Sequence, residues 1–110
     1  MKQKRAYTIN ELSSCNLEGY LTPTEFGEVV GVLDYKMWGK SVNLWAFFTL
    51  DDGKRIKLSC FRSRKDESIY SAQDEKYNFA VVGNEGFKFK LIISTTKTGN
   101  IRFKSAELLN

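Results

Sequence analysis

From Phe26 onward, apolar and polar residues alternate in short runs that are separated by turn-forming residues. A period of two places successive side chains on opposite faces of a β-strand. The pattern predicts strands over Phe26–Tyr35, Asn43–Leu50, Arg55–Arg62, Tyr77–Val82, Phe87–Ser94 and Ile101–Ser105. Many short strands with regular turns are typical of an antiparallel barrel or sandwich, so we expect an all-β protein.

The connections between these runs carry recognisable turn chemistry. Asp51-Asp52-Gly53-Lys54 lies between two apolar runs, and an Asp-Gly pair in that position predicts a β-hairpin. Gly31, inside a Val-rich run, suggests a bulge or tight bend. The polar stretch Arg62–Lys76 is compatible with a short helix or a long connection.

The first 25 residues differ from the rest of the chain. Thr8 and Glu11 fit a capping box, which predicts a short helical turn over Ile9–Ser14. Gly19–Pro23 is expected to be extended, because the proline restricts the backbone there. We therefore divide the chain into an N-terminal extension, residues 1–25, and a β-domain, residues 26–110.

Alternation assigns the predicted hairpin two faces of different character. The inward row is expected to be apolar and consists of Leu44, Ala46, Phe48, Leu50, Ile56, Leu58 and Cys60. The outward row then holds Trp45 and Phe47 beside Lys57 and Phe61. Large aromatic rings in water do not stabilise a fold unless something covers them. They form either a binding surface or a surface covered by a helix or the N-terminal segment, and a bulge reversing Phe47 is a further alternative.

Composition narrows the function classes. The chain has 17 Lys and Arg against 13 Asp and Glu, a net charge of +4, which suits a polyanionic partner without requiring one. It has no His, and Cys15 and Cys60 have neither metal-ligand spacing nor a visible base partner. No phosphate-cradling glycine motif is present. We therefore expect no metal, no cofactor and no catalysis.

The N-terminus and the apolar runs bear on location. The basic residues at the start are followed by no apolar stretch, so a signal peptide is not expected. The apolar runs are too short to span a membrane as a helix. A cytoplasmic location is the resulting expectation.

The run Gly27–Leu33, followed by Asn43–Leu58 with its Thr-Leu-Asp-Asp-Gly turn, resembles the first three strands of an oligonucleotide-binding (OB) fold. Residues 77–108 are similar to its last two strands. This resemblance implies a five-stranded Greek-key barrel, here with a short N-terminal helix or extension. Within the OB class the chain looks most like the small single-strand-binding proteins of phages and mobile elements. It departs from the bacterial housekeeping type in lacking a Gly/Gln/Pro-rich tail with an acidic tip.

The resemblance implies a binding face on strands two and three, flanked by two loops, here Tyr35–Val42 and Thr95–Asn100. Bases would stack on aromatic rings, at roughly 1–3 kcal/mol for each base, and cations would follow the phosphates. The expected aromatic contacts are Tyr35, Trp38, Trp45, Phe47 and Phe61. The expected phosphate contacts are Lys36, Lys40, Arg55, Lys57, Lys88, Lys90 and Lys97. The plainer alternatives are that Trp38 folds onto the end of the barrel and that the strand lysines are simply solvated.

These expectations favour non-catalytic, largely sequence-independent binding of single-stranded DNA in replication or recombination. An RNA-binding barrel and a protein-interaction module for replication or recombination proteins are the alternatives. Exposed strand edges also leave a homo-oligomer open.

Overall fold

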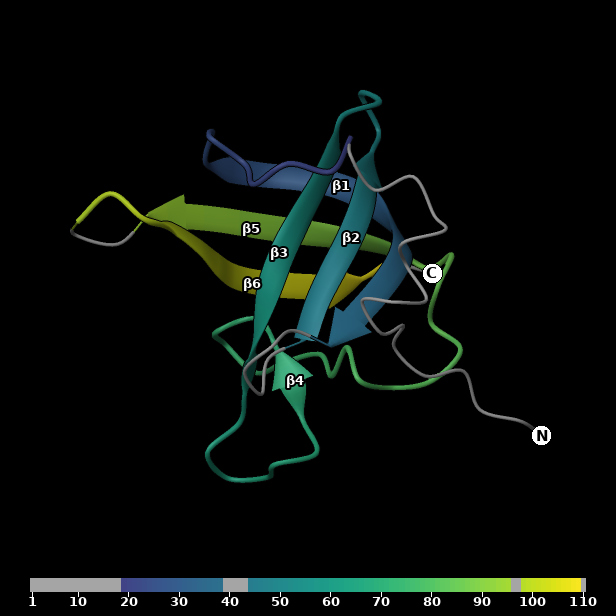
Figure 1. The fold of residues 1–110 in the computed structure, drawn as a ribbon, viewed down its shortest axis with the longest axis vertical. Coiled ribbons are helices and arrows are strands. Elements are labelled where there is room, and N and C mark those ends of the chain that lie inside the picture. The colour runs from purple at the N-terminus through teal and green to yellow at the C-terminus, as the bar shows by residue number, and fades with distance from the viewer. Residues whose placement is uncertain (1–18, 39–43, 96–97, 110) are drawn as a thin grey trace.

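A computed structural model describes residues 19–38, 44–95 and 98–109, and these residues form six antiparallel strands and no helix (Figure 1). The strands are β1 (Gly27–Trp38), β2 (Leu44–Leu50), β3 (Arg55–Arg62), β4 (Tyr70–Ser71), β5 (Lys88–Thr95) and β6 (Ile101–Leu108). Their order in the sheet is β4-β3-β2-β1-β5-β6. The all-β prediction is confirmed, but the sheet does not close into a barrel. The predicted helix at 9–14 lies outside the described residues.

The β2–β3 hairpin is the element that the sequence predicts best. Phe48 pairs with Ile56 and Ala46 with Leu58, and the inward row is buried along both strands, as alternation requires. Gly53 adopts a φ of 88° in the predicted turn, and Leu50 N–H donates to the Lys54 carbonyl at 2.7 Å. The hairpin therefore has one buried face and one outward face, in the predicted register.

Strand β1 joins two layers of the sheet. Its first half pairs with β5 and its second half with β2, and Gly31 lies opposite both Leu50 and Phe89. A Cβ at Gly31 would lie 2.8 Å from Leu50 Cδ2 and 3.0 Å from the Thr49 carbonyl oxygen, so the close approach requires glycine. The register of β1 against β2 shifts between Leu33 and Tyr35, which leaves Asp34 as an extra, bulged residue.

The core lies between these two layers. Figure 1 shows β2 and β3 crossing β5 and β6, with β1 curving from one layer to the other. The Phe48 ring of β2 lies 6.2 Å from that of Phe89 on β5 and 6.5 Å from that of Phe103 on β6. Phe79 fills the centre, 5.0 Å from Phe89 and 5.9 Å from Phe48. Aromatic packing, mostly edge to face, therefore holds the layers together.

The connection between β3 and β5 spans the gap between β3 and β6. Its short strand β4 pairs with the end of β3, where Phe61 faces Ser71. Two residues later the same segment pairs with β6, because Gln73 N–H donates to the Phe103 carbonyl at 2.9 Å and Asp74 N–H to that of Lys104 at 3.1 Å. A loop, rather than a direct ladder between β3 and β6, therefore joins the two edges of the sheet.

The predicted strand at Tyr77–Val82 is wrong: this segment forms consecutive turns. Side chains form hydrogen bonds with the backbone N–H and carbonyl groups that would otherwise have paired with a neighbouring strand. The Asn78 side-chain oxygen accepts from the backbone N–H groups of Tyr70 at 2.9 Å and Ala80 at 3.0 Å. The Lys36 ammonium donates to the carbonyls of Phe79 and Val81.

Two predicted strand limits also need correction. Strand β1 continues to Trp38, through the first part of the stretch predicted as the loop 35–42. Strand β6 continues to Leu108 rather than ending at Ser105. In each case pairing with a neighbour extends the strand, β2 for β1 and β5 for β6.

Candidate nucleic-acid interface

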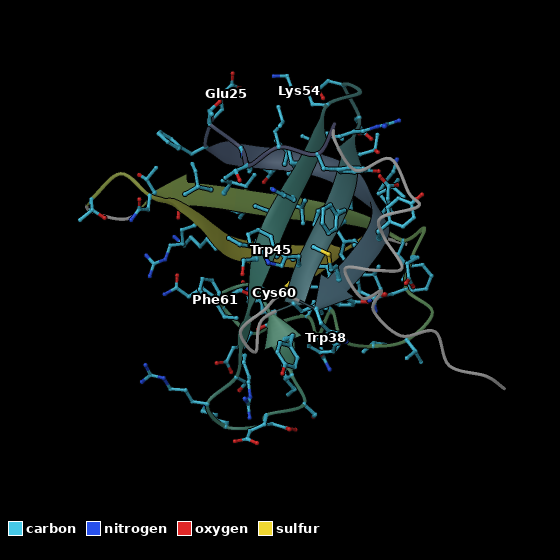
Figure 2. All side chains as sticks on the ribbon, in the orientation of Figure 1. Glu25, Trp38, Trp45, Lys54, Cys60 and Phe61 are labelled. Carbon is cyan, nitrogen blue, oxygen red and sulfur yellow. The ribbon has the colours of Figure 1, made fainter. Side chains whose placement is uncertain are left out.

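The outer surface of the β2–β3 hairpin carries an aromatic and basic group of side chains, Trp45, Lys57 and Phe61, which we call the hairpin face. Lys57 Nζ lies over the Trp45 ring, 5.7 Å from its centroid. Phe61 is 46 % exposed. Figure 2 shows Trp45 and Phe61 on the half of the hairpin away from the Lys54 turn. The structure thus brings together a partly exposed indole, an ammonium group and an exposed phenyl ring.

Phe47 is not available for stacking, contrary to prediction. It points outward between Tyr35 and Lys57 in the register, yet its side chain is only 3 % exposed. Tyr20 covers it, with the two rings edge to face at 5.4 Å. Coverage by the segment before β1 was one of the alternatives that the sequence left open.

Lys36 is the second correction. The bulge at Asp34 turns Lys36 to the inner side of β1, where it is 1 % exposed. Its Nζ donates to the Phe79 carbonyl at 2.9 Å and to the Val81 carbonyl at 2.7 Å. An ammonium group held inside the core cannot contact a phosphate on the surface.

The same bulge separates the other two aromatic residues of β1. Tyr35 pairs with Phe47 and lies on the outer side, 6.3 Å from the Tyr20 ring. Trp38 lies at the end of the strand, 37 % exposed, with its ring edge to face with Tyr70 at 4.9 Å. Trp38 therefore packs on the end of the molecule, the plainer of its two predicted placements.

The predicted cations divide between the two layers. Arg55 is at the turn end of the hairpin, with its guanidinium 5.6 Å from the Tyr20 ring centroid. Lys88 and Lys90 belong to β5, on the outer side of the other layer, and do not join the hairpin face. Lys88 is paired with Asp51 at 3.8 Å, and Lys90 with Glu28 at 3.9 Å and Glu107 at 3.7 Å. Lys40 and Lys97 lie outside the described residues.

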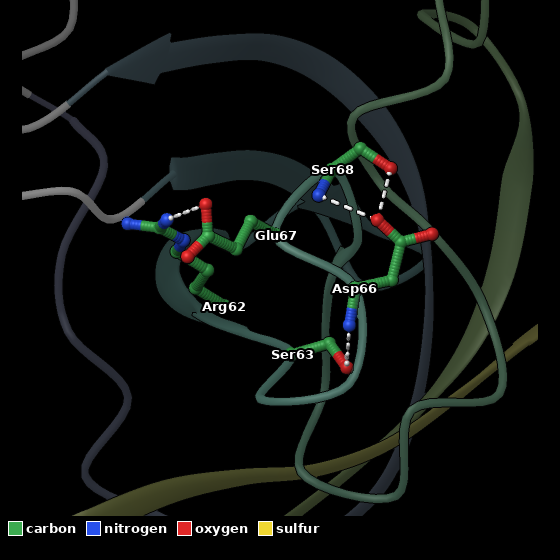
Figure 3. Close-up of polar contacts among 5 residues, drawn as sticks. All are labelled: Arg62, Ser63, Asp66, Glu67 and Ser68. Carbon is green, nitrogen blue, oxygen red and sulfur yellow. Dashed lines mark hydrogen bonds and ion pairs between the residues drawn. The ribbon is translucent and has the colours of Figure 1, made fainter.

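The segment after β3 adds cations that the sequence analysis did not single out, the exposed Arg64 and Lys65. Its backbone is held by its own side chains (Figure 3). Asp66 accepts from the N–H of Ser68 at 2.9 Å and from its hydroxyl at 2.7 Å, and these bonds lower the pKa of Asp66. Arg62 pairs with Glu67 at 2.7 Å. These contacts therefore give a defined shape to the exposed loop between Ser63 and Ile69, which we call the tip and which follows Phe61 in the sequence.

A groove of about 460 Å³ opens beside Tyr20, on the same outer surface. Its lining residues are Tyr20, Leu33, Asp34, Tyr35, Thr49, Arg55, Glu85 and Gly86. Asp34 Oδ2 accepts from the Tyr20 hydroxyl at 2.9 Å and the Thr49 hydroxyl at 2.5 Å. Burial, and then the bond to Asp34, raise the pKa of Tyr20 to about 12. This groove was not predicted from the sequence, although a carboxylate inside the apolar run of β1 was a visible signal.

Other kinds of site find no support in the described part of the chain. There, no three His, Cys, Asp or Glu side chains are grouped as ligands for a metal ion. Residues 19–38, 44–95 and 98–109 include no helix of the length and apolarity that a membrane crossing requires. In comparisons with protein-family models, curated proteins and solved structures, none matched this chain.

Proposed function

We propose that this protein binds single-stranded DNA without catalysing a reaction, in the replication or recombination of a phage or mobile element. The observation that carries the proposal is the hairpin face, where Lys57 lies over Trp45 near the exposed Phe61. Any base can stack on an aromatic ring, and a neighbouring cation attracts the phosphate that follows it. Binding of this kind is largely independent of sequence.

The strand order supports an OB-type assignment. We assign β1, β2, β3, β5 and β6 to the five strands of that fold, whose barrel is often partly open. In this assignment the hairpin face falls on strands two and three, where OB-folds bind oligonucleotides. The Tyr70–Asp74 segment occupies the gap between the third and fifth strands.

The environment of Cys60 makes this residue unsuited to act as a catalytic nucleophile. The thiol is fully buried between the layers, and burial raises the pKa of Cys60 far above its usual value. It stays protonated at neutral pH and is a poor nucleophile.

The test is a titration with oligo(dT), followed by tryptophan fluorescence in a Trp38→Phe variant, so that Trp45 alone reports. We expect quenching on binding, and an affinity that falls with salt with a log–log slope of about −0.7 for each phosphate contact. Trp45→Ala and Lys57→Ala should each weaken binding by about tenfold, because the first removes a stacking contact worth roughly 1–3 kcal/mol and the second removes a charge beside the phosphate. Because Trp45→Ala removes the fluorescent reporter, the affinities of both variants are measured from the fluorescence anisotropy of a dye-labelled oligo(dT).

Lys90→Ala is the matched control, because it removes an equal charge from the other layer. It should leave the oligo(dT) affinity within about twofold. If oligo(dT) neither binds nor quenches at low salt, the proposal fails and a protein-interaction role for the hairpin face is favoured. The same titration repeated with oligo(U) and with duplex DNA distinguishes binding of single-stranded DNA from binding of RNA or of duplex DNA.

A further inference from the structure

The groove beside Tyr20 differs from the hairpin face in charge. Two of its lining residues are carboxylates, Asp34 and Glu85, and Arg55 is its one cation. Carboxylates repel a phosphate, so the backbone of a nucleic acid is not the part that this groove would hold. A group that donates hydrogen bonds suits it better.

Asp34 is held in one orientation. Its Oδ2 atom receives both hydroxyl hydrogen bonds, from Tyr20 and Thr49, which fixes the carboxylate on the bulge of β1. The Tyr20 hydroxyl is protonated, and therefore a donor, at neutral pH, and its pKa, raised to about 12, extends this state into alkaline solution. The other oxygen, Oδ1, is left to accept from a ligand. A positioned acceptor of this kind confers selectivity, because little ordering remains to be done on binding.

Glu85 supplies the second observation. Its Oε1 atom is buried and has no hydrogen-bond partner among the described residues. A buried acceptor without a donor is unfavourable by roughly 1–3 kcal/mol, so a movement of the Glu85 side chain that brought this oxygen to an N–H group of a ligand would relieve that cost. Glu85 stands on the loop that pairs with β1, since Gly86 N–H donates to the Leu33 carbonyl at 2.6 Å.

The groove and the hairpin face lie on the same outer side of the β2–β3 hairpin, separated by Tyr20. Thr49 and Trp45 lie on the same outer row of β2, four residues apart, which corresponds to roughly 14 Å along a strand. Tyr20 lies between them, over Phe47, with Arg55 beside its ring. A strand of nucleic acid that stacks on Trp45 can therefore place a base further along the strand, rather than the adjacent one, in the groove.

We propose that this groove is a base-reading subsite, in which Asp34 accepts a hydrogen bond from the exocyclic amino group of a base and so favours cytosine over thymine. The two pyrimidines are similar in size, but cytosine carries an N4 amino donor where thymine carries an O4 acceptor. Thymine would place its O4 against a carboxylate oxygen, with no hydrogen between them. The inference rests on the proposed function and adds a base preference to it.

The experiment compares oligo(dC) and oligo(dT) of equal length at pH 8, again with Trp45 as the reporter. We expect the protein to bind oligo(dC) about tenfold more tightly, the effect of one hydrogen bond to a charged acceptor. An oligonucleotide of N4,N4-dimethylcytosine, which keeps the ring but has no N4 donor, should lose this preference.

Asp34→Asn is the matched variant of the protein. The Asn amide can donate to thymine O4 as well as accept from cytosine N4, so the preference for oligo(dC) should fall to twofold or less, whereas Lys90→Ala should keep the full preference. The dimethylated ligand makes the same test on the unaltered protein, should Asp34→Asn fail to fold.

The two proposals fail differently. Equal binding of oligo(dC) and oligo(dT), both quenching Trp45, would overturn the base-reading subsite and leave the proposed function standing. A preference that survives in Asp34→Asn or with the dimethylated ligand would also overturn it. Absence of binding to every oligonucleotide would overturn both proposals.

Discussion

Lys36 shows how far one residue's surroundings can depart from its chemical type. A lysine is rarely buried, and a buried lysine needs hydrogen-bond partners. Here two carbonyl oxygens from a distant segment accept hydrogen bonds from the ammonium group. Its four-carbon stem fills space in the core, and its ammonium group connects β1 to the turns at Phe79–Val81. Sequence alone could not separate this lysine from the exposed lysines, because the single extra residue at Asp34 turns Lys36 inward.

Replacing Lys36 with Ala should therefore affect stability and not binding. The change removes two charge-assisted hydrogen bonds and leaves a cavity, and we expect the free energy of unfolding to fall by about 3 kcal/mol. Urea denaturation followed by fluorescence measures the loss, and an oligo(dT) titration well below the unfolding transition should give an affinity within twofold of the parent. If the Lys36→Ala variant kept its stability but bound DNA more weakly, the conclusion that Lys36 does not contact phosphate would be wrong.

The elements were predictable to different degrees, and the reason lies in where their partners come from. The β2–β3 hairpin is specified locally, by alternation and an Asp-Gly turn, and its register follows the prediction. The Tyr77–Val82 segment has the apolar content of a strand, but the side chains of Lys36 and Asn78 bind its backbone instead. That outcome depends on a residue more than 40 positions away, which no local pattern reveals.

Strand β1 offers a test at this scale. Gly31→Ala should destabilise the protein by roughly 1–3 kcal/mol, because the added methyl group would press on Leu50 and on the Thr49 carbonyl. Gly19→Ala is the matched control, since its nearest neighbour would be Arg55 Cδ at an ordinary 3.7 Å. Thermal unfolding of both variants measures the difference, and equal melting temperatures would show that β1 can move away from β2.

At the scale of the molecule, the aromatic cluster around Phe79 makes one core from two layers of strands. Phe48, Phe89 and Phe103 come from three different strands, and each packs against Phe79. The sequence indicates an all-β fold of short antiparallel strands, but not the open seam between β3 and β6. Coverage of the outer face by the N-terminal segment was one of two alternatives, and Tyr20 provides it over Phe47, so fewer aromatic rings are exposed than the predicted site contains.

A single core predicts a single unfolding transition. We expect the denaturation curve from Trp45 fluorescence, on β2, to coincide with the curve from far-UV circular dichroism, which reports all strands. The Trp38→Phe variant is the protein to use. Two separated transitions would mean that the β2–β3 hairpin unfolds independently of the β5–β6 layer.

The tip between Ser63 and Ile69 is closed at its base, where Ser63 N–H donates to the Ile69 carbonyl at 2.9 Å. The residues enclosed by that hydrogen bond, 64–68, are all exposed and belong to no strand. Extra residues placed there would leave every strand pairing unchanged, and doubling the length of such a loop costs only about 0.6 kcal/mol in closure entropy. This tip is therefore a suitable position for a grafted peptide or a surface-immobilisation tag, and a segment whose length can change during evolution without loss of strand pairing.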